Sequence, residues 1–322
     1  MQLNAPLVTI GIPNYNYAHY IKEALDSVVN QTYQNIELII VDDLSSDNSI
    51  VEIENWIRNY KGDIQINFIK NKSNKGLTKV CNIILKNAKG KYFQTLDADD
   101  ILLPRKIEKQ LILLEKEKNV ALIYSNIGMI DEKGKLINSD YLKHIGYNEN
   151  AMPEGNIFEA LFDFNFVPLP SVLVNTEMAR TAGGFDEMQQ VQDYYLWLKL
   201  SEKHDALYLK EKTAYYRSHQ SSMSRSAITN PRSVESVLNI KYKYFKNSTK
   251  EIQEKIKKNI HFSAAYLYEH KITSAAIWLK RDFLFNPGIK SFTYFVAIHL
   301  GIPFSFFGSI KKIAHSKKTK PH

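Results

Sequence analysis

Apolar runs of strand length alternate with amphipathic segments of helix length along the first hundred residues. A strand that begins at Leu7 runs into a turn by Asn16, and an amphipathic helix is expected from there to about Val29. The same pattern predicts three more strands and two more helices, namely strands from Ile36 to Asp43, over Ile64–Ile69 and over Tyr92–Leu96, and helices around Trp56 and over Thr78–Ala88. Strands alternating with helices at this spacing predict a mostly parallel α/β sheet with helices on both faces.

The strand expected before residue 97 ends in an unusually acidic stretch, Thr95-Leu96-Asp97-Ala98-Asp99-Asp100. Carboxylates this close together repel one another and resist ionising unless a cation lies among them. Oxygen ligands suit Mg²⁺ or Mn²⁺, and ligands of parallel sheets gather at the carboxyl ends of the strands. The stretch therefore predicts a metal–diphosphate site. The alternative is an acidic loop that caps a helix starting near Pro104.

Seven segments, read in order over residues 7–225, resemble the inverting glycosyltransferases of family 2, which have the GT-A fold. They are IPNYN, QTYQNIELIIVDDLSSDNS, NKGLTKVCN, GKYFQTLDADD, AGGFDE, QDYYLWLKL and YRSHQSSMS. The resemblance implies a Rossmann-like GT-A sheet, a nucleotide-diphospho-sugar donor, a divalent metal and inversion at the anomeric carbon. In this family such enzymes commonly build bacterial surface polysaccharides.

The resemblance also implies which residues hold the nucleotide. Pro13 and Tyr15 match the first strand–helix turn, which holds the nucleoside, and Asp43 matches the residue that hydrogen-bonds the uracil imide. A carboxylate acceptor there favours uracil over cytosine, because cytosine has no donor at that position. Gly76 matches a glycine that allows the backbone to approach the donor closely. Asp42 is expected to cap the local turn instead.

The acidic stretch matches the DxD motif of the family. Asp99 is the expected main metal ligand. Asp97 is expected near the ribose and is also a candidate second ligand of the metal. Asp100 competes with Asp99 for the role of main ligand, because the motif can be read in either register. Family members often carry an arginine where this chain has Cys81. A cation that could hold the nucleotide is therefore missing, and Lys75 or Lys79 is the expected substitute.

Asp193 matches the catalytic base of the family, which takes the proton of the acceptor hydroxyl. The usual glutamate before this aspartate is Gln192 here, which removes a like charge that would raise the pKa of Asp193. The alternative is that Asp193 simply caps the following helix. Asp186 and His219 are assigned to the acceptor side. For Asp186 the alternative is a turn with a purely structural role. For His219 the alternatives are an exposed loop histidine and a contact with the diphosphate or the metal.

The 322 residues, 44% of them hydrophobic, are enough to form a globular core. The single cysteine, Cys81, excludes an intrachain disulfide and fits a reducing compartment. No signal peptide is expected, because the chain enters a core strand within its first ten residues. These features predict a cytoplasmic protein.

Residues 226–322 are strongly basic, with 17 Lys and Arg against 5 Asp and Glu. Within them Ser291–Ile310 contains no Asp, Glu, Lys or Arg, is interrupted by Gly301 and Pro303, and precedes five lysines, at positions 311, 312, 317, 318 and 320. We expect short helices in the anionic interface of the cytoplasmic membrane. The alternative is an ordinary helical subdomain with a solvated tail. Nucleic-acid binding is not expected, because no recognition module accompanies the basic residues.

The sequence thus predicts a catalytic domain over residues 1–225, with a nucleotide-sugar half to residue 105 and an acceptor half after it, and a basic helical region over 226–322. The expected enzyme is a metal-dependent glycosyltransferase of the hexosyltransferase type. It would move a sugar from a UDP-sugar to a lipid-linked or polysaccharide acceptor. The alternatives are a nucleotidyltransferase and a catalytically degenerate sugar-nucleotide-binding protein. The second alternative rests on Cys81 and Gln192, which depart from the family pattern.

Overall fold

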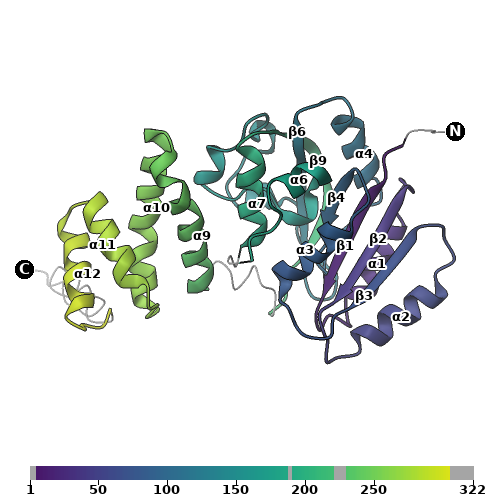
Figure 1. Cartoon of the computed structure of the whole chain (residues 1–322), viewed down its shortest axis with the longest axis horizontal. Coiled ribbons are helices and arrows are strands. Elements are labelled where there is room, and N and C mark those ends of the chain that lie inside the picture. The colour runs from purple at the N-terminus through teal and green to yellow at the C-terminus, as the bar shows by residue number, and fades with distance from the viewer. Residues whose placement is uncertain (1–4, 188–190, 221–229, 305–322) are drawn as a thin grey trace, which may run out of the picture. The chain divides into compact units, whose positions relative to one another are not determined.

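The computed structural model describes residues 5–187, 191–220 and 230–304. The chain divides into two compact units, residues 1–222 and residues 223–322 (Figure 1). The first unit is an α/β domain and the second consists of helices.

The first unit is built on one sheet that has nine strands among the described residues, with the spatial order β3-β2-β1-β4-β8-β6-β9-β5 and β7 paired to β6. The strands are β1 Val8–Asn14, β2 Ile36–Asp42, β3 Gln65–Lys70, β4 Tyr92–Thr95, β5 Ile101–Leu102, β6 Val120–Ile130, β7 Leu136–Asn138, β8 Leu173–Asn175 and β9 Asp205–Arg217. β3, β2, β1 and β4 are parallel neighbours, and β6 and β9 are also parallel. The remaining pairs, which involve β5, β7 and β8, are antiparallel.

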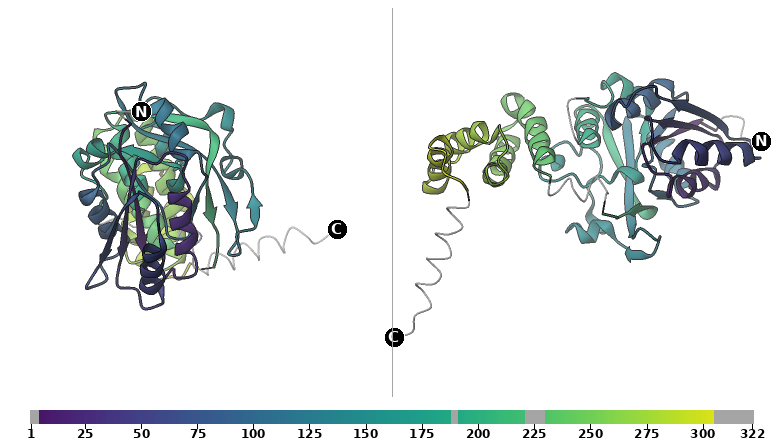
Figure 2. Two further views of the ribbon diagram at one scale, coloured as in Figure 1. Left: turned by 90° about the vertical axis from the view of Figure 1, so that its right-hand side faces the viewer. Right: turned by 90° about the horizontal axis from the view of Figure 1, so that it is seen from below.

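Helices pack on both faces of this sheet (Figures 1 and 2). They are α1 Ile21–Val29, α2 Ser49–Asn59, α3 Leu77–Asn87, α4 Lys106–Leu114, α5 Tyr141–His144, α6 Thr176–Thr181 and α7 Gln192–Ser201, with 3-10 turns at Glu149–Ala151, Ala160–Phe162 and Leu169–Ser171.

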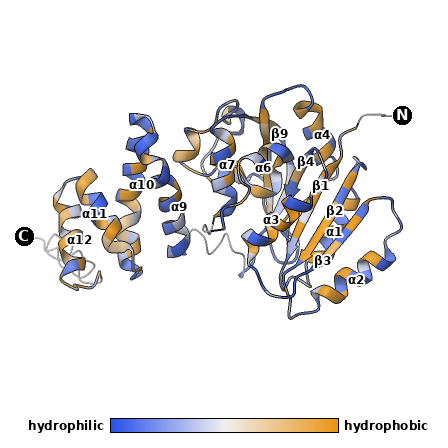
Figure 3. Ribbon diagram, viewed as in Figure 1, coloured by the Kyte–Doolittle hydropathy of each residue, from blue (hydrophilic) through white to orange (hydrophobic). Residues whose placement is uncertain are grey.

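The alternation of side chains along β1 explains this two-sided packing. Ile10 and Ile12 are fully buried in the core cluster that also contains residues of α1 and α4. Gly11, between them, faces the other side of the sheet. A Cβ built on Gly11 would lie 2.0 Å from Cγ2 of Ile84 in α3. The absence of a side chain at Gly11 therefore lets α3 pack directly on the centre of the sheet. Figure 3 shows the central strands as the most hydrophobic part of this unit.

The predicted α/β class and the mostly parallel sheet are confirmed. The predicted helix through Val29 ends at that residue, and the strand expected over residues 64–69 is β3, shifted by one residue. The helix expected near Pro104 begins at Lys106, and its N-cap residue, Arg105, makes no side-chain capping hydrogen bond. The acidic stretch therefore does not cap this helix, and that alternative is wrong.

The second unit contains four α-helices among its described residues, α9 Pro231–Tyr244, α10 Lys250–Glu269, α11 Ala275–Phe285 and α12 Ile289–His299, and the short turn Phe245–Asn247. Its buried core includes Leu238, Ile256, Leu267, Trp278 and Leu279. Residues 305–322, which include the end of the predicted interfacial segment and its five lysines, lie outside the described residues. Among the helices of the described ranges, none combines the length and apolar character that a membrane span requires.

Candidate active site

Three carboxylates meet in the loop between β4 and β5. Each of Asp97, Asp99 and Asp100 places one carboxylate oxygen within 4.8 Å of those of the other two. Asp99 and Asp100 are buried, and Asp97 is partly exposed. Oδ2 of Asp100 is buried and has no hydrogen-bond partner among the described residues. The sheet thus concentrates negative charge at the carboxyl end of its central parallel strands.

The proton affinities of these side chains reflect their crowding. Burial, and after it the charges of Asp99 and Asp193, raise the pKa of Asp97 to about 7. Burial and the two neighbouring aspartates raise the pKa of Asp100 well above its usual value. Burial also raises the pKa of Asp99, against the opposing effect of His219. A divalent cation among these oxygens would relieve both the desolvation and the repulsion.

Carboxylate oxygens are the ligands that Mg²⁺ and Mn²⁺ prefer, and an unpartnered buried oxygen is what a missing cation leaves behind. The orphaned Oδ2 of Asp100 and the spacing of the three carboxylates therefore fit a single divalent ion. The cluster suits either metal, since both take oxygen ligands.

His219 reaches the same cluster from the segment after β9. Its Nε2 atom lies 2.8 Å from Oδ2 of Asp99, and its ring is 6% exposed. The imidazole stacks on Tyr20 with a centroid distance of 5.2 Å and meets Tyr17 edge-on at 6.0 Å. The sequence left three roles open for His219, namely an exposed loop residue, a contact on the acceptor side and a contact with the metal or the diphosphate. Its burial shows that the first of these is wrong. The structure brings it to the carboxylate that is the expected metal ligand.

Arg217, which the sequence analysis missed, donates hydrogen bonds to two residues of the carboxylate cluster. Its backbone N–H donates to Oδ1 of Asp100 at 2.9 Å, and its Nε donates to the carbonyl oxygen of Asp99 at 2.8 Å. Its guanidinium also pairs with Glu23 of α1 at 2.7 Å and lies 4.9 Å from the ring centroid of Tyr20. A signal was present in the sequence, because Arg217 stands two residues before His219 in the YRSHQSSMS segment. Arg217 therefore fixes the backbone that presents the carboxylates.

Asp43 follows β2, and its side chain holds the loop between β3 and α3 in place through hydrogen bonds. Its carboxylate accepts hydrogen bonds from the backbone N–H groups of Lys75 and Gly76, at 2.8–3.0 Å, and from Nδ2 of Asn71 at 2.8 Å. Gly76 has φ of 85°, a left-handed conformation that favours glycine, and a Cβ there would meet nothing within 4 Å. The loop thus presents open backbone at Gly76 beside the end of β2.

Asp42 has the capping role expected of it. Its carboxylate accepts from the backbone N–H of Ser45 at 2.9 Å, from the Ser45 hydroxyl at 2.6 Å and from Nδ2 of Asn14 at 2.8 Å. Both adjacent acids at the end of β2 therefore organise loops at the carboxyl edge. Pro13 is buried in β1, whereas Tyr15 is 47% exposed at the same edge.

Asp193 lies in the first turn of α7, where the helix dipole favours a carboxylate. Burial raises its pKa, while hydrogen bonds from its own N–H, from that of Tyr194 and from the Asn165 side chain oppose the shift. Asp193 also raises the pKa of Asp97 and that of the Cys81 thiol, so the three groups lie within electrostatic reach. Cys81 is buried, and a neutral thiol therefore stands where family members often carry a cation.

Asp186 lies in the turn after α6 and is partly buried. That turn is formed by Gly183 and Gly184, which have φ of 94° and 69°. Residues 188–190, which join this turn to α7, lie outside the described residues. The structure thus gathers Asp97, Asp99, Asp100 and His219 at one site, places Asp43 and Gly76 in a neighbouring loop, and puts Asp193 within electrostatic range of Asp97.

A sheet of this topology with a cluster of carboxylates at its carboxyl edge is typical of nucleotide-binding α/β enzymes. The profile of "Glycosyl transferase family 2" matches residues 9–167. An uncharacterized glycosyltransferase of Rickettsia prowazekii is 30% identical over 303 residues, which cover 91% of this chain and 85% of that protein. The chain therefore belongs to glycosyltransferase family 2.

Other relatives are much longer than the aligned region. A chondroitin synthase of Escherichia coli is 31% identical over 197 residues, which cover 61% of this chain and 27% of that protein. An uncharacterized glycosyltransferase of Rickettsia felis is 37% identical over 204 residues, which cover 62% of this chain and 32% of the relative. The chain thus matches about a third or less of the length of these two proteins.

Solved glycosyltransferases have the same fold. The mannosyltransferase PcManGT of Pyrobaculum calidifontis, in complex with GDP-Man and Mn²⁺, superposes with a TM-score of 0.59 at 15% identity, covering 96% of this chain and 85% of that one. TarS of S. aureus, residues 1–349 in complex with UDP-GlcNAc, gives a TM-score of 0.58 at 17% identity, covering 90% of this chain and 78% of that one. These likenesses confirm the GT-A fold that the sequence predicted.

Proposed function

We propose that this glycosyltransferase is metal-dependent and inverting, and that it moves one sugar from a UDP-sugar to a glycan or lipid-linked acceptor. The observation that carries the proposal is the carboxylate cluster with its orphaned buried oxygen, within electrostatic reach of the partly buried Asp193. Mn²⁺ or Mg²⁺ is the proposed cofactor, held by Asp99 with Asp97 and Asp100. His219 is the proposed further contact to the metal or the diphosphate, because it already contacts Asp99.

The reaction breaks the bond between the anomeric carbon and the diphosphate oxygen and forms a bond from that carbon to the acceptor oxygen. Asp193 is the proposed base that takes the acceptor hydroxyl proton on the face opposite the leaving group. The metal, when bound, would stabilise the charge of the diphosphate. Burial of Asp193 supports this role, because a raised pKa makes a carboxylate a stronger base. Asp186 is the proposed acceptor-side contact.

The donor nucleotide is proposed to be UDP. Tyr15 and Pro13 are the proposed nucleoside contacts, the open backbone at Gly76 approaches the donor, and Asp43 is proposed to accept the uracil imide hydrogen. TarS has been solved with UDP-GlcNAc, which supports a uridine donor, whereas PcManGT has been solved with GDP-Man. Because Asp43 also anchors Lys75 and Gly76, its replacement disturbs the loop as well as any base contact.

Asp43→Ala should weaken UDP binding by about 1.5–3 kcal/mol, the range for a hydrogen bond to a charged group. The unchanged protein should bind CDP much less well than UDP. Calorimetry with both nucleotides separates the two roles of Asp43. If the carboxylate reads the base, Asp43→Ala loses the preference for UDP over CDP. If it only anchors the loop, both nucleotides weaken equally and the preference remains, which would refute the uracil assignment.

A screen of nucleotide-sugars for slow hydrolysis in the presence of Mn²⁺ tests the proposed function directly. The expected result is release of UDP from at least one UDP-sugar, with no release when EDTA is present. A degenerate binding protein would bind the nucleotide without releasing it. A nucleotidyltransferase would instead release pyrophosphate from a nucleoside triphosphate mixed with a sugar phosphate, so the same panel excludes or supports that alternative.

The acceptor is proposed to be a growing polysaccharide or a lipid-linked glycan at an anionic membrane surface, on the cytoplasmic side. The second unit supports this, because α11 and α12 expose large apolar side chains, Ile277, Leu284, Ile289, Phe292 and Leu300. Phe283 of α11 packs on Phe292 and Phe295 of α12, with ring centroids 5.4 and 5.7 Å apart. The exposed residues recur at helical spacing on each helix, and the exposed Lys280 and Lys290 lie among them. A lysine-flanked apolar face fits an anionic interface.

The full chain should therefore sediment with vesicles of phosphatidylglycerol and phosphatidylcholine. High salt should weaken but not abolish binding, because salt screens lysine–lipid attraction and leaves apolar insertion intact. Ile289→Glu with Phe292→Glu should release the protein. Leu136→Glu, at a similarly exposed position in the first unit, is the matched control and should leave binding unchanged. Failure of the full chain to sediment would remove the membrane proposal without touching the sugar transfer.

A further inference from the structure

The turn after α6 is held against α3 by a pair of hydrogen bonds across 103 positions of the sequence. Nδ2 of Asn82 donates to the carbonyl oxygen of Phe185 at 2.8 Å, and the N–H of Phe185 donates to Oδ1 of Asn82 at 2.9 Å. We call this pair the Asn82–Phe185 clamp. Gly184, with φ of 69°, is required beside it, since a Cβ there would lie 2.8 Å from Oδ1 of Asn82. The contact is therefore built into both segments.

Neighbouring contacts extend the clamp along the same face of α3. Arg180 of α6 donates through Nε and one terminal nitrogen to the carbonyl oxygen of Leu85, at 3.3 and 3.0 Å, and the terminal nitrogen also reaches the carbonyl of Ala88. Lys79 and Glu187 form an exposed ion pair at 3.9 Å. Of these contacts, the clamp is the one that holds the backbone of the turn itself, and it does so at a buried residue, since Phe185 is 3% exposed.

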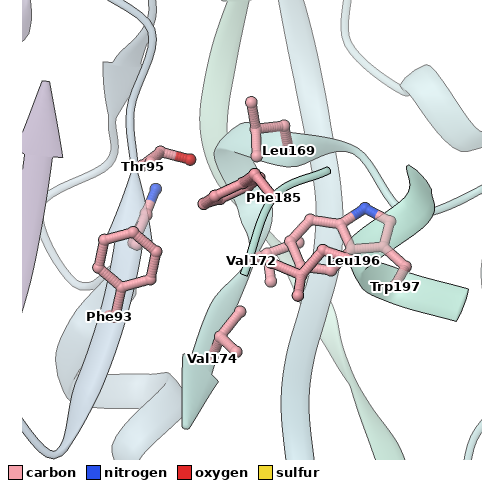
Figure 4. Close-up of a pocket in the computed structure, with 9 residues that line it drawn as sticks. Phe93, Thr95, Leu169, Val172, Val174, Phe185, Leu196 and Trp197 are labelled. Carbon is pink, nitrogen blue, oxygen red and sulfur yellow. The ribbon is translucent and has the colours of Figure 1, made fainter. Parts of the chain in front are cut away.

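The Phe185 side chain enters the interior between the two elements that carry the proposed chemistry. Its ring meets Phe93 of β4 edge-on, with centroids 6.4 Å apart. It lines one small pocket together with Phe93, Leu196 and Trp197 (Figure 4). β4 leads directly into Asp97, and Leu196 lies one helical turn after Asp193 in α7. Phe185 therefore separates the strand of the carboxylate cluster from the helix of the proposed base.

We propose that Asn82 is a positioning residue, which through Phe185 sets the separation between the metal-binding carboxylates and Asp193. This inference rests on the proposed role of Asp193 as the base. Asn82 is one residue from Cys81, whose thiol lies in the field of both Asp97 and Asp193, so α3 runs beside both halves of the site. When the clamp is lost, Phe185 is free to shift, and α7 with it. The base is then displaced relative to the bound donor while the nucleotide loop stays in place.

The test compares Asn82→Ala, Asn82→Asp and the control Asn87→Ala, an exposed position of the same helix, with hydrolysis of the nucleotide-sugar that the donor screen identifies. Asn82→Ala should lower kcat by roughly 10–100-fold, since a 1 Å displacement of a catalytic group costs up to about a hundredfold. The donor KM and the UDP affinity should stay within about twofold, because the interactions made in the ground state are retained. Asn82→Asp keeps the acceptor for the Phe185 N–H and should show a smaller loss. Asn87→Ala removes only an exposed hydrogen bond to the carbonyl oxygen of Ile83 within α3 and should behave as the unchanged protein.

Hydrogen exchange of the Phe185 amide provides the readout that does not depend on activity. Both Asn82 variants should raise its exchange rate, Asn82→Ala the more. Faster exchange with unchanged kcat would overturn the positioning role, as would a rise in donor KM with constant kcat. If the unchanged protein hydrolyses no nucleotide-sugar, the proposed function fails and this inference with it. Hydrolysis that Asn82→Ala and Asn82→Asp leave untouched overturns the inference alone.

Discussion

Asp193→Asn should reduce sugar transfer and donor hydrolysis by roughly 10²–10⁴-fold, the usual worth of a positioned general base. Asparagine has nearly the same size and can still accept from the N–H groups at the start of α7, so the helix and its packing should survive. It cannot take a proton from the acceptor hydroxyl. UDP affinity should remain nearly unchanged, because the proposed base faces the acceptor. Rates of UDP release and calorimetry with UDP measure the two quantities.

The pH profile adds an independent check on the same residue. Because burial raises the pKa of Asp193, the proposed base should be protonated and inactive at pH values where an ordinary aspartate is already ionised. The ascending limb of kcat/KM should therefore lie at higher pH than the usual aspartate value, and activity should fall as the pH drops through it. Asp186→Asn is the matched comparison. If Asp186→Asn abolishes turnover and Asp193→Asn does not, the base is Asp186.

Removing the divalent ion should slow donor hydrolysis by at least about a hundredfold, since metal stabilisation of a leaving diphosphate is worth several kcal/mol and each 1.36 kcal/mol is tenfold in rate. Mn²⁺ or Mg²⁺ should also tighten UDP binding, because a cation held by the carboxylates of Asp97, Asp99 and Asp100 would attract the negatively charged diphosphate. Calorimetry of UDP binding with Mn²⁺ and with EDTA measures this second effect. Equal affinities under the two conditions would rule out a metal at the cluster.

Asp99→Asn should remove most of the tightening by Mn²⁺ and leave the fold intact, because an amide can still meet His219. Asp100→Asn distinguishes the two possible registers of the motif. Oδ1 of Asp100 already accepts from Arg217, whereas its buried Oδ2 has no partner among the described residues. If Asp100→Asn costs more Mn²⁺ affinity than Asp99→Asn, the orphaned oxygen belongs to the principal ligand. Adding Mn²⁺ back after EDTA treatment should fully restore the UDP affinity of the unchanged protein.

The fold could largely be predicted from periodicity. The apolar runs gave the parallel strands β1 to β4 to within a residue or two, because β1, β2 and β4 are buried along their whole length and such strands are mostly apolar, although β3 at the edge of the sheet is partly exposed. The strands after β4 were not predicted, neither the long β6 and β9 nor the short antiparallel strands β5, β7 and β8. Length explains the last three. They have two or three residues each, which is too short for any periodicity to show. The helices of the second unit were predicted as a class but without bounds.

The carboxylates of the site could also be found in the sequence, since charged residues directly after a buried strand must lie at the edge of the sheet. Their partners could not. Arg217 and His219 reach Asp99 across 118 and 120 positions, and Asn82 meets Phe185 across 103. Similarly, the sequence alone did not show that Asp43 would hold Lys75 and Gly76, because the loop that supplies those donors closes only when β2 and β3 pair.

The sequence by itself determined the α/β class, the edge of the sheet where the carboxylates lie and the clustering of Asp97, Asp99 and Asp100, since strand periodicity and local charge are properties of neighbouring residues. The tertiary structure decided which cationic and polar groups meet those carboxylates, which oxygen is left without a partner, and how far Asp193 lies from them. These features depend on side chains brought together from distant segments by packing, and packing is determined by the whole core rather than by any one segment.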